Sequence, residues 1–218
     1  MKYKEIIKNK EINAYLEKGN ANLGLLGFTD HSQAHCVQVA RQAGKILERF
    51  GYSEHEVELV KIAGYMHDIG NSINRTHHAE YGALLANDLL KDTDMSLEDR
   101  ITVMSAIGNH DESTGDPEDV ISAALIIADK TDVRRSRVRP KEQSTFDIHD
   151  RVNYAVTDSK LKIAKDKSVI ALNLQIDENI CSMYDYFEIF LERMMLCRKS
   201  AEVLGTTFKL TVNGRKVL

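Results

Sequence analysis

Apolar residues at helical spacing run through the first 140 residues of this 218-residue chain, and this periodicity limits that part to helices. After Ser53, apolar side chains recur at positions i, i+3, i+4 and i+7, as Leu59, Ile62, Ala63 and Met66. Only two prolines, Pro117 and Pro140, occur in the chain, so few points force a helix to end. The pattern predicts a mainly α fold of amphipathic helices that bury their apolar faces against one another.

Capping residues divide this helical part into separate elements. We expect a first helix at 2–18 ended by Gly19-Asn20, a second capped by Thr29 or Asp30 and ended by Gly51, and a third capped by Ser53. A loop at 69–75 then leads to a fourth helix at 76–91. A fifth helix is capped by Ser96, and a sixth has Asp116 as its cap and Pro117 at its first position. A helical bundle over residues 1–140 follows from these signals.

The pattern changes after Pro140. Alternating residues at 160–165 and 169–176 predict strands, and a long helix is expected at 179–204. Asn213-Gly214 suits a two-residue turn, so 208–212 and 215–218 are predicted to form a hairpin. We therefore expect residues 141–218 to be a small α+β appendage of antiparallel strands and one long helix. The sequence leaves open whether this appendage packs on the helical part.

Composition indicates the class of the protein and its expected location but not its activity. Charged residues make up 28% and hydrophobic residues 43%, a balance typical of soluble globular proteins. No stretch approaches the ~20 apolar residues of a membrane span, and the first residues lack the apolar run of a signal peptide, which indicates a cytoplasmic protein with no membrane partner. The net charge of −4 argues against nucleic-acid binding through bulk charge. The three cysteines have unrelated spacings and suggest neither disulfides nor a zinc site.

Several histidines and aspartates fall on the apolar stripes of the expected helices. His35, for example, shares a stripe with Val39 and Ala43. The residues placed in this way are His35, His67, His78, His110 and Asp129, and Asp68 follows His67 directly at the end of its helix. Buried carboxylates are costly unless a cation compensates them, so the set predicts metal binding. Six nitrogen and oxygen ligands exceed the four of a tetrahedral zinc site and suit two ions of Fe, Mn, Co, Zn or Mg.

The motifs around these residues resemble the HD-domain metal-dependent phosphohydrolase superfamily, in its binuclear branch. They are His35 in HCVQVA, His67-Asp68 in HDIG, His78 in HAEYGA, His110 in IGNH and Asp129 in ADK, and they span about residues 29–139. The resemblance implies an HD helical bundle in which His35, His67, Asp68 and Asp129 hold one divalent ion, and His78 and His110 hold a second that Asp68 bridges. Iron or manganese is expected in preference to cobalt, magnesium or zinc. The reaction implied is attack by a hydroxide shared between the ions.

A phosphohydrolase also needs a cation for the charge that develops on the phosphoryl oxygens. Many members of the superfamily carry Lys directly after HDIG, whereas this chain has Asn71. Lys130, beside Asp129, or an arginine of the following RRSRVR run is expected to replace it. We assign substrate binding to Lys130, Arg134, Arg137 and Asn71, catalysis to Asp68 and Lys130, and orientation of the ligands to His31.

The resulting hypothesis is hydrolysis of a phosphomonoester or phosphodiester bond in a small, nucleotide-like molecule. Two alternatives stay open. The same ligands suit a mixed-valent diiron oxygenase, and the fold also suits a nucleotide-binding regulator without activity. The sequence does not identify the substrate or the metal. An exposed edge on the C-terminal hairpin would favour a homodimer.

Overall fold

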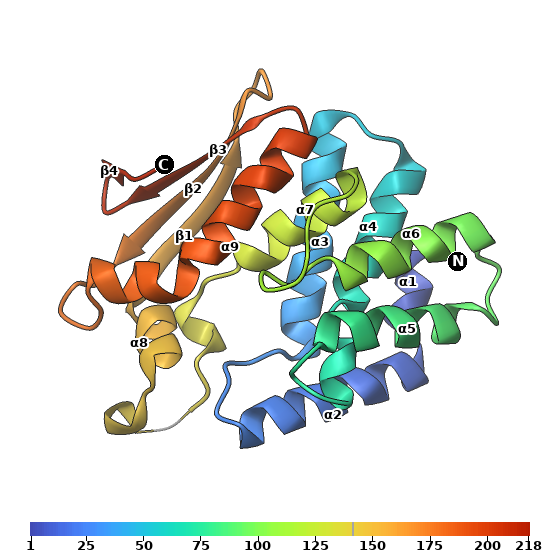
Figure 1. Ribbon diagram of the computed structural model, residues 1–218, viewed down its shortest axis with the longest axis horizontal. Coiled ribbons are helices and arrows are strands. Elements are labelled where there is room, and N and C mark those ends of the chain that lie inside the picture. Colours follow the sequence, from blue (N-terminus) through green and yellow to red (C-terminus); the bar gives the residue numbers. More distant parts are fainter. Residues whose placement is uncertain (141) are drawn as a thin grey trace.

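The structure is a computed structural model that describes residues 1–140 and 142–218. Its α-helices are α1 (Tyr3–Ile6), α2 (Lys10–Leu25), α3 (Gln33–Phe50), α4 (Glu54–Met66), α5 (His78–Leu90), α6 (Leu97–Gly108), α7 (Val120–Lys130), α8 (Ile148–Ala155) and α9 (Met183–Val203). Short 3₁₀ helices lie at Ile69–Ser72, Arg135–Arg137 and Gln143–Thr145. The strands are β1 (Val156–Ile163), β2 (Val169–Ile176), β3 (Thr207–Val212) and β4 (Arg215–Lys216). The mainly α fold with a small C-terminal sheet is confirmed (Figure 1).

The single helix predicted at 2–18 is wrong. Asn9 accepts hydrogen bonds from the backbone N–H groups of Glu11 and Ile12, so α1 ends and α2 begins there. Gly19 does not end a helix but lies inside α2, where a Cβ atom would stand 3.1 Å from the backbone nitrogen of Ser72. Its small size therefore serves a close approach between α2 and the segment that follows HDIG.

Several other helix ends lie where the capping residues predict them. Ser53 caps α4 in a reciprocal box with Glu56, and Ser96 caps α6. Gly51 ends α3 with a positive φ of 89°. The cap of α3 is Ser32 rather than Thr29 or Asp30.

The start of α7 also differs from the prediction based on Asp116 and Pro117. The helix begins after Asp119, whose carboxylate accepts from the N–H of Ser122. Pro117 therefore lies in the loop that joins α6 to α7, and this loop passes beside the cluster described below.

The C-terminal sheet has the order β1-β2-β3-β4. β1 pairs antiparallel with β2, and β3 with β4, but β2 and β3 are parallel, so the expectation of antiparallel strands is wrong for that pair. The reason is that α9 connects β2 to β3 as a crossover helix. β1 begins at Val156 instead of 160, α9 begins at Met183 instead of 179, and β4 ends at Lys216. The sequence reading missed α8.

The appendage packs on the helical part. α9 lies against α7 on one side and against β3 on the other (Figure 1). Ile170, Leu172 and Phe208 of the sheet belong to the same buried core as the helices around the HD motif. The predicted boundary between residues 140 and 141 falls at Lys141, which lies outside the described residues. The packing of α9 on α7 brings C-terminal side chains to the functional site.

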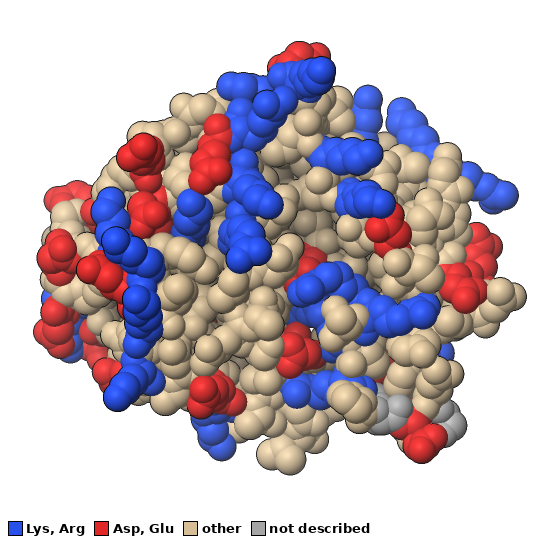
Figure 2. Space-filling model, turned by 180° about the vertical axis from the view of Figure 1, so that it is seen from behind, with Lys and Arg blue, Asp and Glu red and all other residues tan. Residues whose placement is uncertain are grey.

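No helix in the part of the chain that the structure describes combines the length and the apolar character needed to cross a membrane. Acidic and basic side chains are interspersed on the face seen from behind in Figure 2, rather than collected in one broad patch of a single sign.

Candidate metal centre

Separate helix ends supply the residues of the HD-type motifs. His35 lies in the first turn of α3, His67 caps the C-terminus of α4, and Asp68 follows it. His78 is the first residue of α5, and Asp129 lies in the last turn of α7. His110 follows the end of α6 by two positions. The side chains of all six residues are buried or nearly so, with Asp129 the most exposed at 12%.

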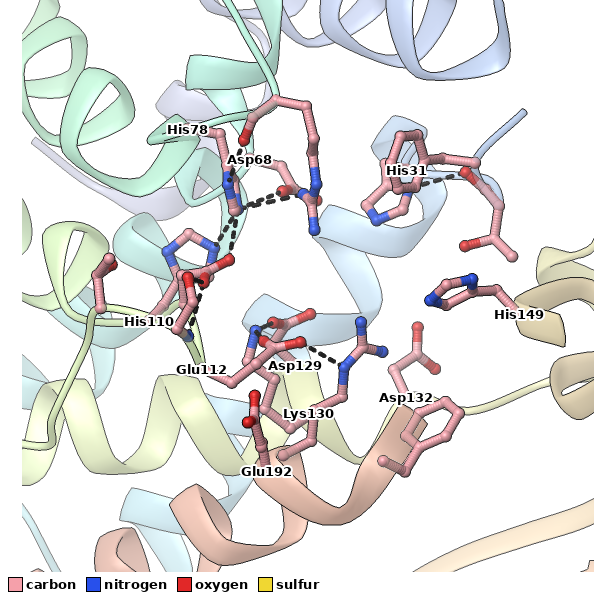
Figure 3. Close-up of a pocket in the computed structure, with 18 of the residues that line it drawn as sticks. His31, Asp68, His78, His110, Glu112, Asp129, Lys130, Asp132, His149 and Glu192 are labelled. Atoms are coloured by element: carbon pink, nitrogen blue, oxygen red, sulfur yellow. Dashed lines mark hydrogen bonds and ion pairs between the residues drawn. The ribbon is translucent and has the colours of Figure 1, made fainter. Parts of the chain in front are cut away.

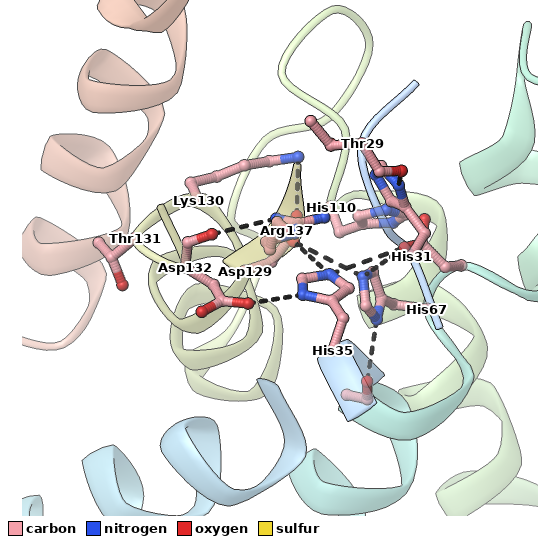
Figure 4. A network of polar contacts seen from close by, with 12 residues as sticks. Thr29, His31, His35, His67, His110, Asp129, Lys130, Thr131, Asp132 and Arg137 are labelled. Atoms are coloured by element: carbon pink, nitrogen blue, oxygen red, sulfur yellow. Dashed lines mark hydrogen bonds and ion pairs between the residues drawn. The ribbon is translucent and has the colours of Figure 1, made fainter. Parts of the chain in front are cut away.

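These six side chains converge at one place. Figure 4 shows His35, His67, His110 and Asp129 close together, and Figure 3 shows Asp68 and His78 near His110. The Nε2 atoms of His35 and His67 lie 3.3 and 3.6 Å from Oδ1 of Asp129, and that of His67 lies 3.2 Å from Oδ2 of Asp68. On the other side of Asp68, Oδ1 lies 3.7 Å from Nε2 of His78. Nε2 of His78 is in turn 3.2 Å from Nε2 of His110. Asp68 thus presents one oxygen to each half of the cluster.

The far side of each imidazole ring is held in place. Nδ1 of His35 contacts the carboxylate of Asp132. Nδ1 of each of the other three rings contacts a backbone carbonyl: that of Gly64 for His67, that of Arg75 for His78 and that of Ile107 for His110. A ring that donates through Nδ1 keeps the lone pair of Nε2 for a metal ion. All four Nε2 atoms therefore face the centre of the cluster as potential ligands.

Several buried atoms at the centre have no hydrogen-bond partner within the described residues: Nε2 of His35, Nε2 of His67 and Oδ2 of Asp68. Buried polar atoms without partners are rare in folded proteins because each costs free energy. Two overlapping groups have the spacing of a metal site, His35 with His67 and Asp129, and His67 with Asp68 and His110. The nitrogen and oxygen donor set fits divalent metal ions.

Burial and mutual charge set the protonation of the cluster. Burial alone would raise the pKa of Asp68 and Asp129, but His67 beside the first and Lys130 beside the second hold both pKa values well below the usual range. Burial lowers the pKa of His110 to about 3, with help from His78 and His67. Both carboxylates are therefore ionised and His110 is neutral at pH 7, as metal ligands must be.

The pKa of His67 shifts in the opposite direction to those of His78 and His110. Burial works to lower its pKa, but the nearby carboxylates of Asp68 and Asp129 outweigh burial and raise the pKa to about 10. The protonated ring of His67 supplies a positive charge between these two carboxylates. A divalent cation bound there would supply that charge instead.

Asp132 is a site residue that the sequence reading missed. Its Oδ2 lies 2.7 Å from Nδ1 of His35, and Arg134 binds the same carboxylate through two contacts of 2.6 and 2.9 Å. Carboxylate partners of this kind orient metal-binding imidazoles. The available signal was spacing, because Asp132 follows Asp129 by three positions, just past the end of α7.

Lys130 lies between two carboxylates. Its Nζ is 2.9 Å from Asp129 and 2.6 Å from Glu112, a residue of the loop between α6 and α7 (Figure 3). Arg193 of α9 binds the other oxygen of Glu112 at 2.6 Å. Asp129 and Glu112 together overcome the effect of burial and raise the pKa of Lys130. The amino group predicted to bind substrate is thus already paired twice.

The remaining predicted residues are placed as follows. Asn71 donates to Oδ1 of Asp68 at 2.8 Å and so orients a predicted metal ligand. Arg137 donates to the backbone carbonyls of Asp30 and Asp132. The structure therefore brings the six predicted ligands together, while it places Asn71 and Arg134 outside the walls of the adjoining cavity.

His31 was predicted to orient the ligands. Its Nδ1 contacts the carbonyl of Thr29 at 2.8 Å, and its ring meets that of His35 edge to face, with centroids 5.6 Å apart. Burial is the main cause that lowers the pKa of His31. The residue lies on the cavity wall, across from Asp68 in Figure 3.

A cavity of about 450 Å³ opens beside the cluster. One wall comes from the helical part and includes Phe28, Arg75 and His78, and the opposite wall comes from α8 and α9. The residues of the second wall are His149, Asn153, Phe190, Glu192 and Arg193. The C-terminal appendage therefore completes the site, which sequence reasoning did not foresee because no motif marks these residues.

Comparison with known proteins gives three findings. A family model described as HD domain matches residues 33–151. The chain is 30% identical over 193 residues to uncharacterized protein MJ1020 of Methanocaldococcus jannaschii, covering 78% of this chain and 74% of that protein. It also resembles the crystal structure of a predicted HD superfamily hydrolase from an uncultured Thermotogales bacterium, with 24% identity, a TM-score of 0.46, and coverage of 57% of this chain and 68% of that one.

Proposed function

Since this chain belongs to the HD domain family, we propose that it is a metal-dependent phosphohydrolase that cleaves a phosphomonoester or phosphodiester bond in a small, nucleotide-like molecule. The observation that carries the proposal is the convergence of four imidazole Nε2 atoms and two carboxylates beside a cavity. His35, His67, Asp68 and Asp129 would hold one divalent ion, and His78 and His110 would hold a second with Asp68 between them.

Two such ions would supply a water nucleophile at neutral pH and positive charge for phosphoryl oxygens. Neighbouring side chains hold the predicted metal ligands in position. Asn71 holds one oxygen of Asp68, and Asp132 holds the ring of His35, so neither ligand needs to reorient when substrate enters. The positive charges of Lys130 and Arg193 offset the negative charges of Asp129 and Glu112, so these carboxylates repel an approaching phosphate less.

The dimensions and lining of the cavity support a small polar substrate. Its volume of about 450 Å³ lies in the range of ligand sites. Away from the metal ligands, Thr29, His149, Asn153 and Glu192 present hydrogen-bonding groups to it. Groups of this kind suit the sugar and base of a nucleotide. The expectations of a homodimer, of no nucleic-acid partner and of a cytoplasmic location stay predictions.

The test begins with metal. The purified protein is stripped with a chelator, reloaded with Mn²⁺ or Fe²⁺, and analysed for metal content beside a His110→Ala variant. We expect about two equivalents in the parent and about one in the variant. His55→Ala is the matched control, because His55 is an exposed residue that pairs with Asp99 on the surface.

Activity is then measured as release of phosphate or nucleotide from a panel of nucleoside monophosphates, cyclic nucleotides and dinucleotides. Turnover that requires the metal and falls in the His110→Ala variant but not in His55→Ala supports the proposal. A metal-loaded protein that is inert across the panel contradicts it. Oxygen consumption by the iron-loaded protein is recorded in parallel, since it would indicate an oxygenase instead.

A further inference from the structure

Several cationic side chains line the cavity, and most of them are already bound within the protein. Lys130 pairs with Asp129 and Glu112, and Arg193 pairs with Glu112 at 2.6 Å. Arg137 donates to two backbone carbonyls at 3.0 and 3.1 Å. Carboxylates therefore offset the charges of Lys130 and Arg193, and backbone carbonyls occupy two donor atoms of Arg137. A phosphate entering the cavity therefore competes poorly for them.

Arg75 is different. Among the described residues, no carboxylate lies within ion-pair distance of its guanidinium, although the side chain lines the cavity. With the described residues its side chain makes two polar contacts, both long and both through the single atom Nη1, which lies 3.4 Å from Oδ1 of Asn71 and 3.3 Å from Nε2 of His78. The other nitrogens of the fork have no protein partner in the described part of the chain.

The guanidinium is nevertheless held in place. Its Cζ atom lies 5.4 Å from the centroid of the Phe28 ring, within the range of a cation–π contact. The backbone carbonyl of Arg75 accepts from Nδ1 of His78, so the same residue that carries the fork also orients a predicted metal ligand. Position and charge are thus set at the edge of the ligand cluster, while the donors stay free.

We propose that Arg75 binds the phosphoryl oxygens of the substrate and takes the role that the sequence reading gave to Lys130, Arg134 and Arg137. This inference rests on the proposed function. Guanidinium donors arranged as a fork match two phosphate oxygens at once, which an ammonium group cannot do. Because Nη1 is 3.3 Å from a ligand atom of His78, a phosphoryl group that reaches the ligand cluster lies within reach of the fork.

The experiment compares Arg75→Lys, which keeps the charge but loses the fork, with Arg75→Gln, which loses both. The probes are inorganic phosphate, whose binding is measured by calorimetry and as an inhibition constant, and p-nitrophenyl phosphate and bis-p-nitrophenyl phosphate as substrates. Metal content is measured for every variant. Arg41→Gln is the control, since Arg41 is exposed on α3 and lines a separate groove with Glu48 and Lys61.

We expect the dissociation constant of phosphate to rise about 10-fold in Arg75→Lys and about 100-fold in Arg75→Gln, with metal content unchanged. Phosphate affinity in Arg75→Gln within twofold of the parent would overturn the proposal. So would a variant that loses metal while its remaining loaded fraction binds phosphate normally, because Arg75 would then only position His78. If Arg75→Gln does not fold, the test uses Arg75→Lys, and a phosphate affinity within twofold of the parent in that variant overturns the proposal.

Failure of the proposed function gives a different result. A parent protein that holds two metal equivalents but neither binds phosphate nor releases p-nitrophenol would end both proposals together. A parent that turns over the ester, beside an Arg75→Gln variant with the same KM and the same phosphate affinity, would remove only the role of Arg75.

Discussion

Replacement of Lys130 by methionine tests whether this residue holds the site together or serves the substrate. Its side chain is 7% exposed, and its ammonium nitrogen lies 2.6 Å from Glu112 and 2.9 Å from Asp129. Lys130→Met leaves these two carboxylates near one another with no cation between them. Removing one partner of a buried ion pair costs about 3–5 kcal/mol. Arg193 still binds Glu112, so we expect the lower end, about 3 kcal/mol.

The assay is urea unfolding of the chelator-treated protein at pH 7. With an m value of about 2–3 kcal/mol/M for a chain of this size, the midpoint should fall by about 1–1.5 M. Lys199→Met is the control, because Lys199 pairs with Asp116 on the surface and should change stability by less than about 1 kcal/mol.

The dependence on pH gives a second check. In spite of burial, Lys130 and Arg193 hold the pKa of Glu112 below its usual value. A carboxyl with a lowered pKa in the folded state stabilises the protein above its unfolded pKa of about 4.3 and loses this contribution as the pH falls further. The difference between parent and Lys130→Met should therefore shrink below about pH 4. An unchanged urea midpoint together with a collapse of turnover would refute this reasoning and restore Lys130 as a substrate ligand.

Three further predictions concern the ligand cluster and its support. Asp132→Ala removes the partner of His35 Nδ1 and should weaken Mn²⁺ binding about 10–100-fold by calorimetry, whereas unchanged affinity would mean that the contact does not orient the ring. Gly70→Ala places a Cβ atom 2.5 Å from the backbone nitrogen of Gly82, so the unfolding free energy should fall by at least about 2 kcal/mol, against less than about 1 kcal/mol for Gly108→Ala, whose Cβ meets only Ala83 at 3.5 Å. Saturating Mn²⁺ at about 100 times its dissociation constant should add about 2.7 kcal/mol to stability, and a melting temperature that does not respond would argue against a metal site.

Local signals account for most of the helical part. The Ser53 and Ser96 caps and Gly51 mark helix ends because each is satisfied by atoms within a few residues. The prediction failed at Asn9, which caps α2 inside the span assigned to one helix, and at Asp119, which caps α7 in place of Asp116. At Gly19 the deciding contact comes from Ser72, far along the chain, and no local pattern contains that information.

The six predicted ligands come together at a common centre because the helices that carry them pack on one another. His35, His78 and Asp129 lie within α3, α5 and α7, whereas His67, Asp68 and His110 follow the C-terminal ends of α4 and α6. The sheet was harder to predict. Strand positions follow from alternation, but the parallel pairing of β2 with β3 depends on where α9 packs. A crossover through a helix and a simple antiparallel sheet can share the same local pattern.

The sequence by itself therefore determined the helical class, the HD-type motifs with their predicted ligands, and the approximate limits of the strands, because periodicity, caps and motifs are local properties. Only the tertiary structure decided which cations are free. Lys130 is adjacent to Asp129 in the chain, but folding also places it against Glu112. Within the described part of the chain, the Arg75 guanidinium contacts the Phe28 ring and makes two long polar contacts, with no carboxylate beside it. Whether a charge can bind a ligand depends on the partners that surround it in space, and these come from segments that the sequence does not place together.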